Sequence, residues 1–195
     1  MKILVTGFDP FGGESMNPSY EAVRALPPRI GGADIVTLKV PTEFGRSLEV
    51  VLAAASAAAA DAVICVGQAG GRAEITPERV AINIADARIP DNAGAQPVDE
   101  PVATDGPAAY FSPLPVKEMV AAVREVGLPA RLSNTAGTFV CNQLLYGLLH
   151  AGLRAGFIHV PYAPDQGEPS LPVAETARGL EAAVGALAAS LGGER

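Results

Sequence analysis

The chain has 195 residues, of which 49% are hydrophobic and 18% are charged, and its formal net charge is −7. This composition excludes a disordered protein, and the negative charge disfavours a nucleic-acid partner, because phosphate binding requires a basic face. Two cysteines are too few for a disulfide framework and predict a reducing, cytoplasmic setting. Because no run of 18 apolar residues occurs, we expect no membrane span.

Strand and helix patterns alternate along the chain. The expected strands are 2–6, 34–40, 62–66, 78–85, 130–134 and 157–160, and the expected helices are 18–26, 42–60, 116–126, 141–150 and 171–191. Asn17 is the expected N-cap of the first helix, with Pro18 at its first position. This order predicts an α/β fold, a three-layer α/β/α sandwich around a mostly parallel, twisted sheet. We expect a single domain over residues 1–195, with a long loop rich in proline and glycine at 88–115.

Cys141 stands where an extended segment of small residues is followed by a helical pattern. A thiol at a helix N-terminus faces free backbone N–H groups and the positive end of the helix dipole, and both favour the reactive thiolate. The alternative is a buried, unreactive thiol. We assign that role to Cys65, which lies inside an apolar strand pattern.

A nucleophilic thiol requires a base, and the chain contains two histidines. His159 lies near the end of an apolar strand pattern, whereas His150 is expected as a cation close to the C-terminus of the Cys141 helix. A hydrogen-bonded core histidine is the alternative for His159. Glu78 begins an apolar strand face and would fix the imidazole tautomer, although an ion pair with Arg72 or Arg79 explains it equally well.

Two loops rich in glycine follow predicted strands, at 6–13 and 67–72, and neither carries a phosphate-binding motif. Phe8 and Phe11 on the first loop suit a small flat ring, or else they anchor the loop to the core. The second loop presents backbone N–H groups and the amide of Gln68. No metal site is expected, because the histidines and cysteines lack ligand spacing.

Six blocks together resemble the pyroglutamyl peptidase type I (pyrrolidone-carboxylate peptidase) family of cysteine peptidases. They cover nearly the whole chain in order: 6–13 with 17–19, 66–72, 75–83, 86–92, 136–142 and 157–161. The stretch between Cys141 and His159 is shorter than is usual in the family, which predicts a trimmed helix end or loop there.

The resemblance implies a Cys–His–Glu triad at Cys141, His159 and Glu78, together with a pocket for a lactam ring. By motif position, the walls of that pocket are Phe8, Phe11, Ile89, Phe139 and Val140. Asn17 and the Gln68 loop are expected to bind the polar edge of the ring. The backbone N–H of Cys141, with help from Arg88, is expected to stabilise the oxyanion.

The resemblance further implies a cytoplasmic homotetramer without a cofactor, and it implies no membrane or nucleic-acid partner. The expected activity is removal of an N-terminal pyroglutamyl (5-oxoproline) residue from peptides by thiolate attack and thioester hydrolysis. Two alternatives remain from the residues alone. One is a phosphate-utilising α/β enzyme that uses the glycine loops, and the other is a non-catalytic protein that binds pyroglutamyl peptides.

Overall fold

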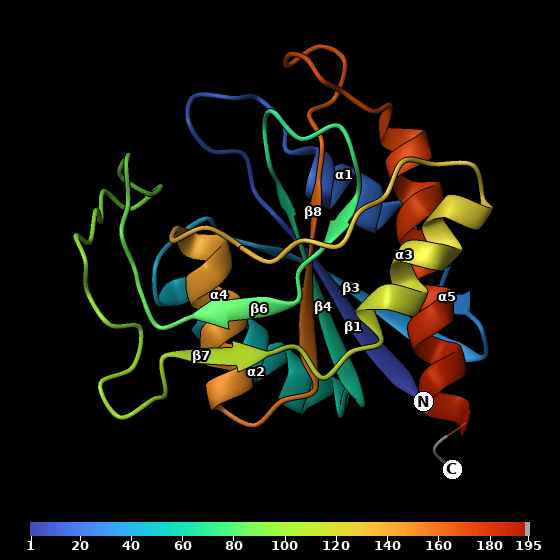
Figure 1. Cartoon of the computed structure of the whole chain (residues 1–195), viewed down its shortest axis with the longest axis horizontal. Coiled ribbons are helices and arrows are strands. Elements are labelled where there is room, and N and C mark those ends of the chain that lie inside the picture. The colour runs from blue at the N-terminus through green and yellow to red at the C-terminus, as the bar shows by residue number, and fades with distance from the viewer. Residues whose placement is uncertain (194–195) are drawn as a thin grey trace.

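The computed structural model describes residues 1–193 and is built around a six-stranded sheet (Figure 1). Its strands, in the order β2-β3-β1-β4-β8-β5 across the sheet, are β2 (Arg29–Ile30), β3 (Ala33–Val40), β1 (Lys2–Phe8), β4 (Ala62–Gln68), β8 (Ala155–Val160) and β5 (Thr76–Pro77). The four central strands β3, β1, β4 and β8 run parallel, whereas β2 and β5 are antiparallel at the two edges. The prediction of a mostly parallel sheet is confirmed.

The helices cover both faces of this sheet (Figure 1). They are α1 (Pro18–Arg24), α2 (Arg46–Ala58), α3 (Val116–Glu125), α4 (Val140–His150) and α5 (Val173–Gly193). α1, α3 and α5 pack on one face, and α2 and α4 pack on the other, which confirms the three-layer sandwich. Within residues 1–193, none of the helices combines the length and the hydrophobicity that crossing a bilayer would require.

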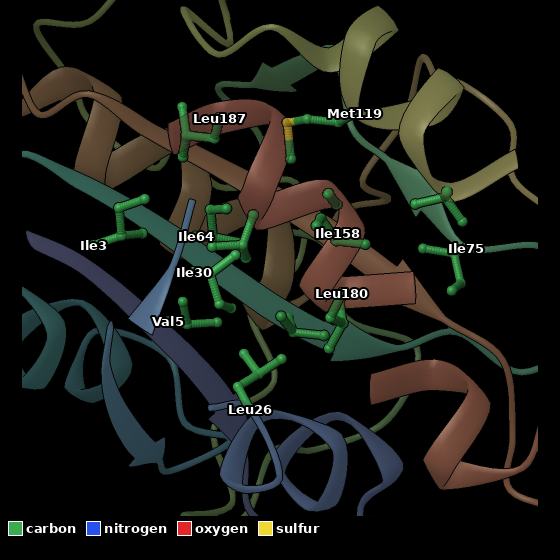
Figure 2. Close-up of a cluster of buried hydrophobic side chains, with 14 of the residues drawn as sticks. Ile3, Val5, Leu26, Ile30, Ile64, Ile75, Met119, Ile158, Leu180 and Leu187 are labelled. Carbon is green, nitrogen blue, oxygen red and sulfur yellow. The ribbon is translucent and has the colours of Figure 1, made fainter. Parts of the chain in front are cut away.

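Side chains of the central strands alternate between two hydrophobic cores, because successive residues of a strand point to opposite faces. Figure 2 shows the larger core, in which the sheet residues Ile3, Val5, Ile64 and Ile158 meet Met119 of α3 and Leu180 and Leu187 of α5. The opposite core, below α2 and α4, receives Leu4, Phe8, Val63, Cys65 and Phe157. Burial on both faces explains why the strand at 62–66 is a continuous apolar run.

The loop after β1 is held against α1 by a close approach and by hydrogen bonds. A Cβ atom on Gly7 would lie 2.5 Å from the Tyr20 Cα, so only glycine fits where α1 crosses the strand. The backbone N–H of Phe8 donates to Ser19 Oγ at 3.1 Å. Asn17 Oδ1 accepts from the backbone N–H and the hydroxyl of Ser19, at 3.1 and 2.7 Å, which confirms Asn17 as the N-cap.

The predicted strand at 78–85 is wrong as a single element. Its alternating pattern spans a break between β5, which ends at Pro77, and β6 (Val80–Ile82). β6 pairs with β7 (Ala109–Phe111) in a separate two-stranded sheet, in which Ala81 is buried while Ile84, just beyond β6, is 36% exposed. The buried side of this segment is therefore not the one that carries Val80, Ile82 and Ile84.

The break arises because the backbone changes hydrogen-bond partner at Glu78. Its N–H still donates to the Phe157 carbonyl of the main sheet at 2.8 Å, whereas the N–H of Arg79 donates to the Ser133 carbonyl at 2.8 Å. The segment 130–134, predicted as a strand, makes only isolated bridges at Ala130 and Ser133. That prediction is also wrong. The segment pairs only with the chain around Ile75 and Glu78, and these two bridges are too few to form a continuous strand ladder.

Two further boundaries differ from the prediction. α2 begins at Arg46 after Gly45, whose φ is +70°, and not near Thr42. The Thr42 hydroxyl instead donates to Asp9 Oδ1 at 2.8 Å and joins two loops. The loop predicted at 88–115 contains β7, so the regular structure resumes earlier than expected.

Candidate active site

Cys141 is the second residue of α4, as the sequence predicted. The N-cap residue is Phe139, whose side chain makes no capping hydrogen bond. The first N–H groups of a helix have no partner inside the helix, so α4 presents backbone donors around Cys141. The Cys141 side chain is half-buried against the core below α2 and α4.

Because Gly67 has no side chain, the sulfur of Cys141 can lie close to β4, the strand next to the one that carries His159. A Cβ atom on Gly67 would lie 3.1 Å from Cys141 Sγ and 2.8 Å from the Phe157 ring. Gly67 of β4 is paired in register with His159 of β8. Because paired residues of neighbouring parallel strands point to the same face, the imidazole and the sulfur lie on one face of the sheet, one strand apart.

His159 is bound to Glu78 on its other side. The distance from His159 Nδ1 to Glu78 Oε1 is 2.8 Å, and Glu78 is fully buried. The ring of His159 also packs on Phe157, with 4.7 Å between the ring centroids. With Nδ1 donating to the carboxylate, Nε2 is the nitrogen left to accept a proton. The structure therefore places His159 in contact with Glu78 and one strand away from the sulfur of Cys141, so the three residues that the sequence singled out lie in one region of the sheet.

Arg72 binds the same carboxylate oxygen. Its Nη1 lies 2.6 Å from Glu78 Oε1, so this one oxygen receives both the imidazole and the guanidinium. The ion pair that the sequence offered as an alternative for Glu78 is thus present, together with the histidine contact. The pairing with Arg79 is not among the ion pairs of residues 1–193.

The resting thiol is neutral, in contrast to the thiolate expected from the helix position. Burial raises the pKa of Cys141 to about 12, and the charge of Glu78 acts in the same direction. Arg72 and a backbone hydrogen bond lower this pKa by less than burial raises it. The helix start was predicted correctly, but the sequence did not reveal that packing around the sulfur would raise its pKa.

The imidazole is also neutral at rest. Burial lowers the pKa of His159 below its ordinary value of 6.5, and Arg72 adds to this effect, while the hydrogen bond and charge of Glu78 oppose it. For Glu78, burial alone would raise the pKa, but His159, Ser133 and Arg72 outweigh it and leave the pKa below 4.5. Near neutral pH the site therefore holds a thiol, a neutral imidazole and a carboxylate.

Three phenylalanine rings surround the start of α4. Phe139 lies 6.4 Å from Phe11 and 5.3 Å from Phe44, measured between ring centroids, and its contact with Phe44 is edge-to-face. Phe11 and Phe139 were predicted as pocket walls. Phe44 was missed, because a lone aromatic residue before a helix gives no local signal of such a contact.

The segment that carries Arg88 and Ile89 is anchored at both ends beside these rings. The Thr138 hydroxyl donates to the Asp86 carbonyl at 2.7 Å. Asp91 Oδ2 accepts from the backbone N–H of Phe44 at 2.7 Å. Arg88 and Ile89 are exposed between these two anchors, so their side chains are free to contact a bound molecule.

The other predicted pocket residues lie in the core, hold a loop in place or point away from the sheet face that carries Cys141. Phe8 and Val140 are buried in the core, and the Phe8 ring lies 6.2 Å from that of Phe157. Asn17 donates to the Asp9 carbonyl at 2.9 Å besides capping α1, so its amide mainly holds the loop. Gln68 follows Gly67, so its side chain points to the opposite face, where Gln166 Nε2 donates to it at 3.3 Å.

No metal cluster is present in the part of the chain that the structure describes, since no three His, Cys, Asp or Glu side chains there are close enough to hold an ion. Both cysteines are free. The chemistry available at the site is that of a thiol, an imidazole and a carboxylate beside uncapped backbone donors.

Comparisons with known proteins place the whole chain in one family. The family model described as "Pyroglutamyl peptidase" matches residues 1–190. A pyrrolidone-carboxylate peptidase of Erwinia tasmaniensis is 58% identical in sequence, and the alignment covers 94% of this chain and 91% of that protein. A pyrrolidone-carboxylate peptidase of Levilactobacillus brevis is 54% identical, and the alignment covers 96% of this chain and 97% of that protein. The crystal structure of pyroglutamyl peptidase I from Bacillus amyloliquefaciens superposes on this structure with a TM-score of 0.92. The two sequences are 51% identical, and the superposition covers 96% of this chain and 97% of that chain. This chain belongs to the pyroglutamyl peptidase family.

Proposed function

We propose that this protein is a cysteine peptidase that removes the N-terminal pyroglutamyl residue from peptides. The observation that carries the proposal is the convergence of Cys141, His159 and Glu78 within a chain that belongs to this family. Cys141 is the nucleophile, His159 is the general base and acid, and Glu78 holds the imidazole in the productive tautomer.

The first half-reaction forms a thioester. His159 Nε2 takes the proton of the neutral thiol as Cys141 Sγ attacks the carbonyl carbon of the pyroglutamyl residue. Backbone N–H groups at the start of α4 stabilise the oxyanion, and one such donor is worth about 3 kcal/mol in the transition state. Arg88, exposed on its anchored segment, is a further donor in this proposal. His159 then protonates the leaving amine, and the carbon–nitrogen bond breaks.

The second half-reaction hydrolyses the thioester. His159, neutral again, removes a proton from a water molecule that attacks the acyl carbon. The collapse of the second oxyanion releases pyroglutamate, and the sulfur recovers its proton from the imidazolium. The proton balance closes without any cofactor.

The lactam ring is expected to bind against the rings of Phe11, Phe139 and Phe44, and the exposed Ile89 is expected to complete the pocket. These side chains are apolar, and the lactam has no charged amine that would have to lose its hydration there. A free N-terminal amine would place a desolvated charge in this pocket. A prolyl residue has no lactam carbonyl, so any hydrogen-bond donor that binds this carbonyl would be left unpaired, which in comparable sites costs about 10⁴-fold in kcat/KM.

A pyroglutamyl chromogenic amide tests the activity. The protein should release the chromophore, and iodoacetamide should abolish the release. Glutamyl and prolyl amides with the same leaving group should be poor substrates. Binding without product release would favour the non-catalytic alternative, and phosphate-dependent activity that survives alkylation would favour the phosphate-utilising enzyme.

The pH dependence follows from the two shifted groups. Because His159 must be neutral to accept the thiol proton, kcat/KM should rise with pH through a value below 6.5 and then stay level. No second change is expected at the ordinary thiol value of 9.0, since burial raises the pKa of Cys141 to about 12. Measuring kcat/KM for the chromogenic amide as a function of pH tests both the rise below 6.5 and the absence of a change at 9.0. A change centred on 9.0 would contradict the raised pKa of Cys141.

We infer further that the protein forms a homotetramer in the cytoplasm. The inference is supported by the family membership, by the free thiols and by exposed apolar side chains on β7 and the loop before it, where Phe111 is 73% and Val98 is 71% exposed. Light scattering should give the mass of four chains, and Phe111→Asp should shift the protein to smaller species. A wild-type monomer at micromolar concentration would contradict the assembly, and activity confined to a secreted fraction would contradict the compartment.

A further inference from the structure

The carboxylate of Glu78 also contacts Arg72, a residue with no part in the mechanism above. Arg72 lies in the turn after β4, and its side chain is 22% exposed. Its Nη1 meets Glu78 Oε1 at 2.6 Å, and His159 Nδ1 meets the same atom at 2.8 Å. The second carboxylate oxygen, Oε2, is buried and finds no hydrogen-bond partner within residues 1–193. A single atom therefore joins the guanidinium to the imidazole.

Three other contacts fix the guanidinium in this position. Nη1 donates to Thr76 Oγ1 at 2.7 Å, and it lies 3.4 Å from Ser133 Oγ. Nη2 donates to the Thr135 carbonyl at 3.0 Å. The Thr76 hydroxyl in turn donates to the carbonyl of His159 at 3.3 Å. Arg72 thus connects the turn after β4, the edge strand β5 and the segment that leads into α4.

The charge of Arg72 has an effect that a neutral donor would not have. A fully buried carboxylate is costly unless it is paired, so Arg72 keeps Glu78 ionised. Within residues 1–193, the charged groups that act on His159 are Glu78 after β5 and Arg72 after β4, while the thiol of Cys141 on α4 lies beside the neighbouring strand β4. Glu78 alone would favour the imidazolium, and Arg72 opposes this by competing for the same oxygen and by its own charge.

We propose that Arg72 is a positioning residue for the catalytic base, which acts through Glu78 to hold the His159 ring in one tautomer and to keep it neutral between turnovers. The inference rests on the proposed function, because it assumes that His159 is the base. A lysine would preserve the charge at this position. It would not reach Glu78, Thr76 and Thr135 together, because it lacks the planar fork of arginine.

The test compares Arg72→Met and Arg72→Lys with the wild type and with Arg131→Met. Arg131 is a matched control, because it also pairs with a glutamate, Glu74, at 3.5 Å, but its side chain is 58% exposed and forms no ion pair with Glu78 within residues 1–193. Two readouts are used. One is the pH–rate profile with a pyroglutamyl amide, and the other is the NMR titration of the histidine rings. The chain has only two histidines, so His150→Gln assigns the signals.

In Arg72→Met, we expect the titration of His159 and the acid limb of kcat/KM to move together to higher pH. We expect kcat to fall roughly 10- to 100-fold, by analogy with the loss of the residue that holds a metal-binding histidine in place. KM should change little, since Arg72 does not line the aromatic pocket. Arg72→Lys should show a smaller loss, and Arg131→Met should match the wild type in both readouts.

A merely structural role would lower thermal stability without moving either titration. The inference is overturned if folded Arg72→Met titrates like the wild type. If that variant does not fold, wild-type kcat and titration in Arg72→Lys overturn it instead. If the wild type fails to cleave pyroglutamyl amides, the proposed function fails, while the NMR titration still decides whether Arg72 controls the protonation of His159.

Discussion

Replacing Cys141 by alanine should lower kcat/KM for a pyroglutamyl amide by at least about 10⁴-fold, because the atom that forms the new bond is removed. Loss of the nucleophile in a serine peptidase triad has an effect of this size or larger. Folding should be nearly unaffected, since a half-buried thiol is replaced by a smaller apolar group. Steady-state kinetics, with circular dichroism of the same samples, measure both quantities.

Cys65→Ala is the matched control for this variant. Cys65 is fully buried inside β4, between Thr6 of β1 and Phe157 of β8, so a substrate carbonyl cannot reach it and it is not expected to react. Its replacement should cost about 1 kcal/mol of stability through a small cavity and leave kcat within a few-fold of the wild type. Retained activity in Cys141→Ala together with lost activity in Cys65→Ala would reverse the assignment of the nucleophile.

Replacing Glu78 by glutamine should lower kcat on the order of 10³-fold while changing KM little. An amide oxygen can still accept from His159 Nδ1, but it no longer stabilises the imidazolium that forms when the thiol gives up its proton. The corresponding aspartate-to-asparagine change in a serine peptidase triad costs about 10⁴-fold. Glu74→Gln is the control, because Glu74 pairs with exposed Arg131 at 3.5 Å and should be replaceable without loss.

The same substitution should change the response of stability to acid. The pKa of Glu78 is lowered in the folded protein, so its contribution to stability is present above 4.5 and is lost as the pH falls through the lowered value. In Glu78→Gln this contribution is absent at every pH. The melting temperature should therefore be lower than that of the wild type at pH 7, and the difference should shrink below pH 4.5. A difference that grows in acid would contradict the assignment.

The local parts of the fold and site were predictable, because each depends on residues close together in the sequence. The N-cap at Asn17 and the start of the helix at Cys141 both follow from capping and periodicity, and the structure confirms both. The continuous run at 62–66 predicted a strand buried on both faces, and β4 is such a strand.

What could not be predicted depends on long-range contacts. The alternation from Glu78 to Ala85 continues across a point where the backbone leaves the main sheet, and nothing in the pattern marks that change of partner. The sequence left open whether Glu78 pairs with an arginine or with His159, whereas the structure shows one oxygen bound to both. The neutral thiol was missed for a similar reason, because a helix start is visible in a sequence but the depth of burial is not.

The Phe44 contact is a third example. Its ring reaches Phe139 because α2 and α4 lie side by side on one face of the sheet, an arrangement set by tertiary packing. The sequence contains both rings, 95 positions apart, and no periodic pattern connects them.

The most direct test of the triad and its chemistry is to trap the acyl-enzyme. The protein is mixed with excess pyroglutamyl substrate, quenched in acid within one turnover, and examined by intact-mass and peptide-mapping mass spectrometry. The expected result is the added mass of one pyroglutamyl acyl group, confined to the peptide that contains Cys141 and absent from Cys141→Ala. Turnover with the acyl group on another residue, or hydrolysis by Cys141→Ala at the wild-type rate, would contradict the account.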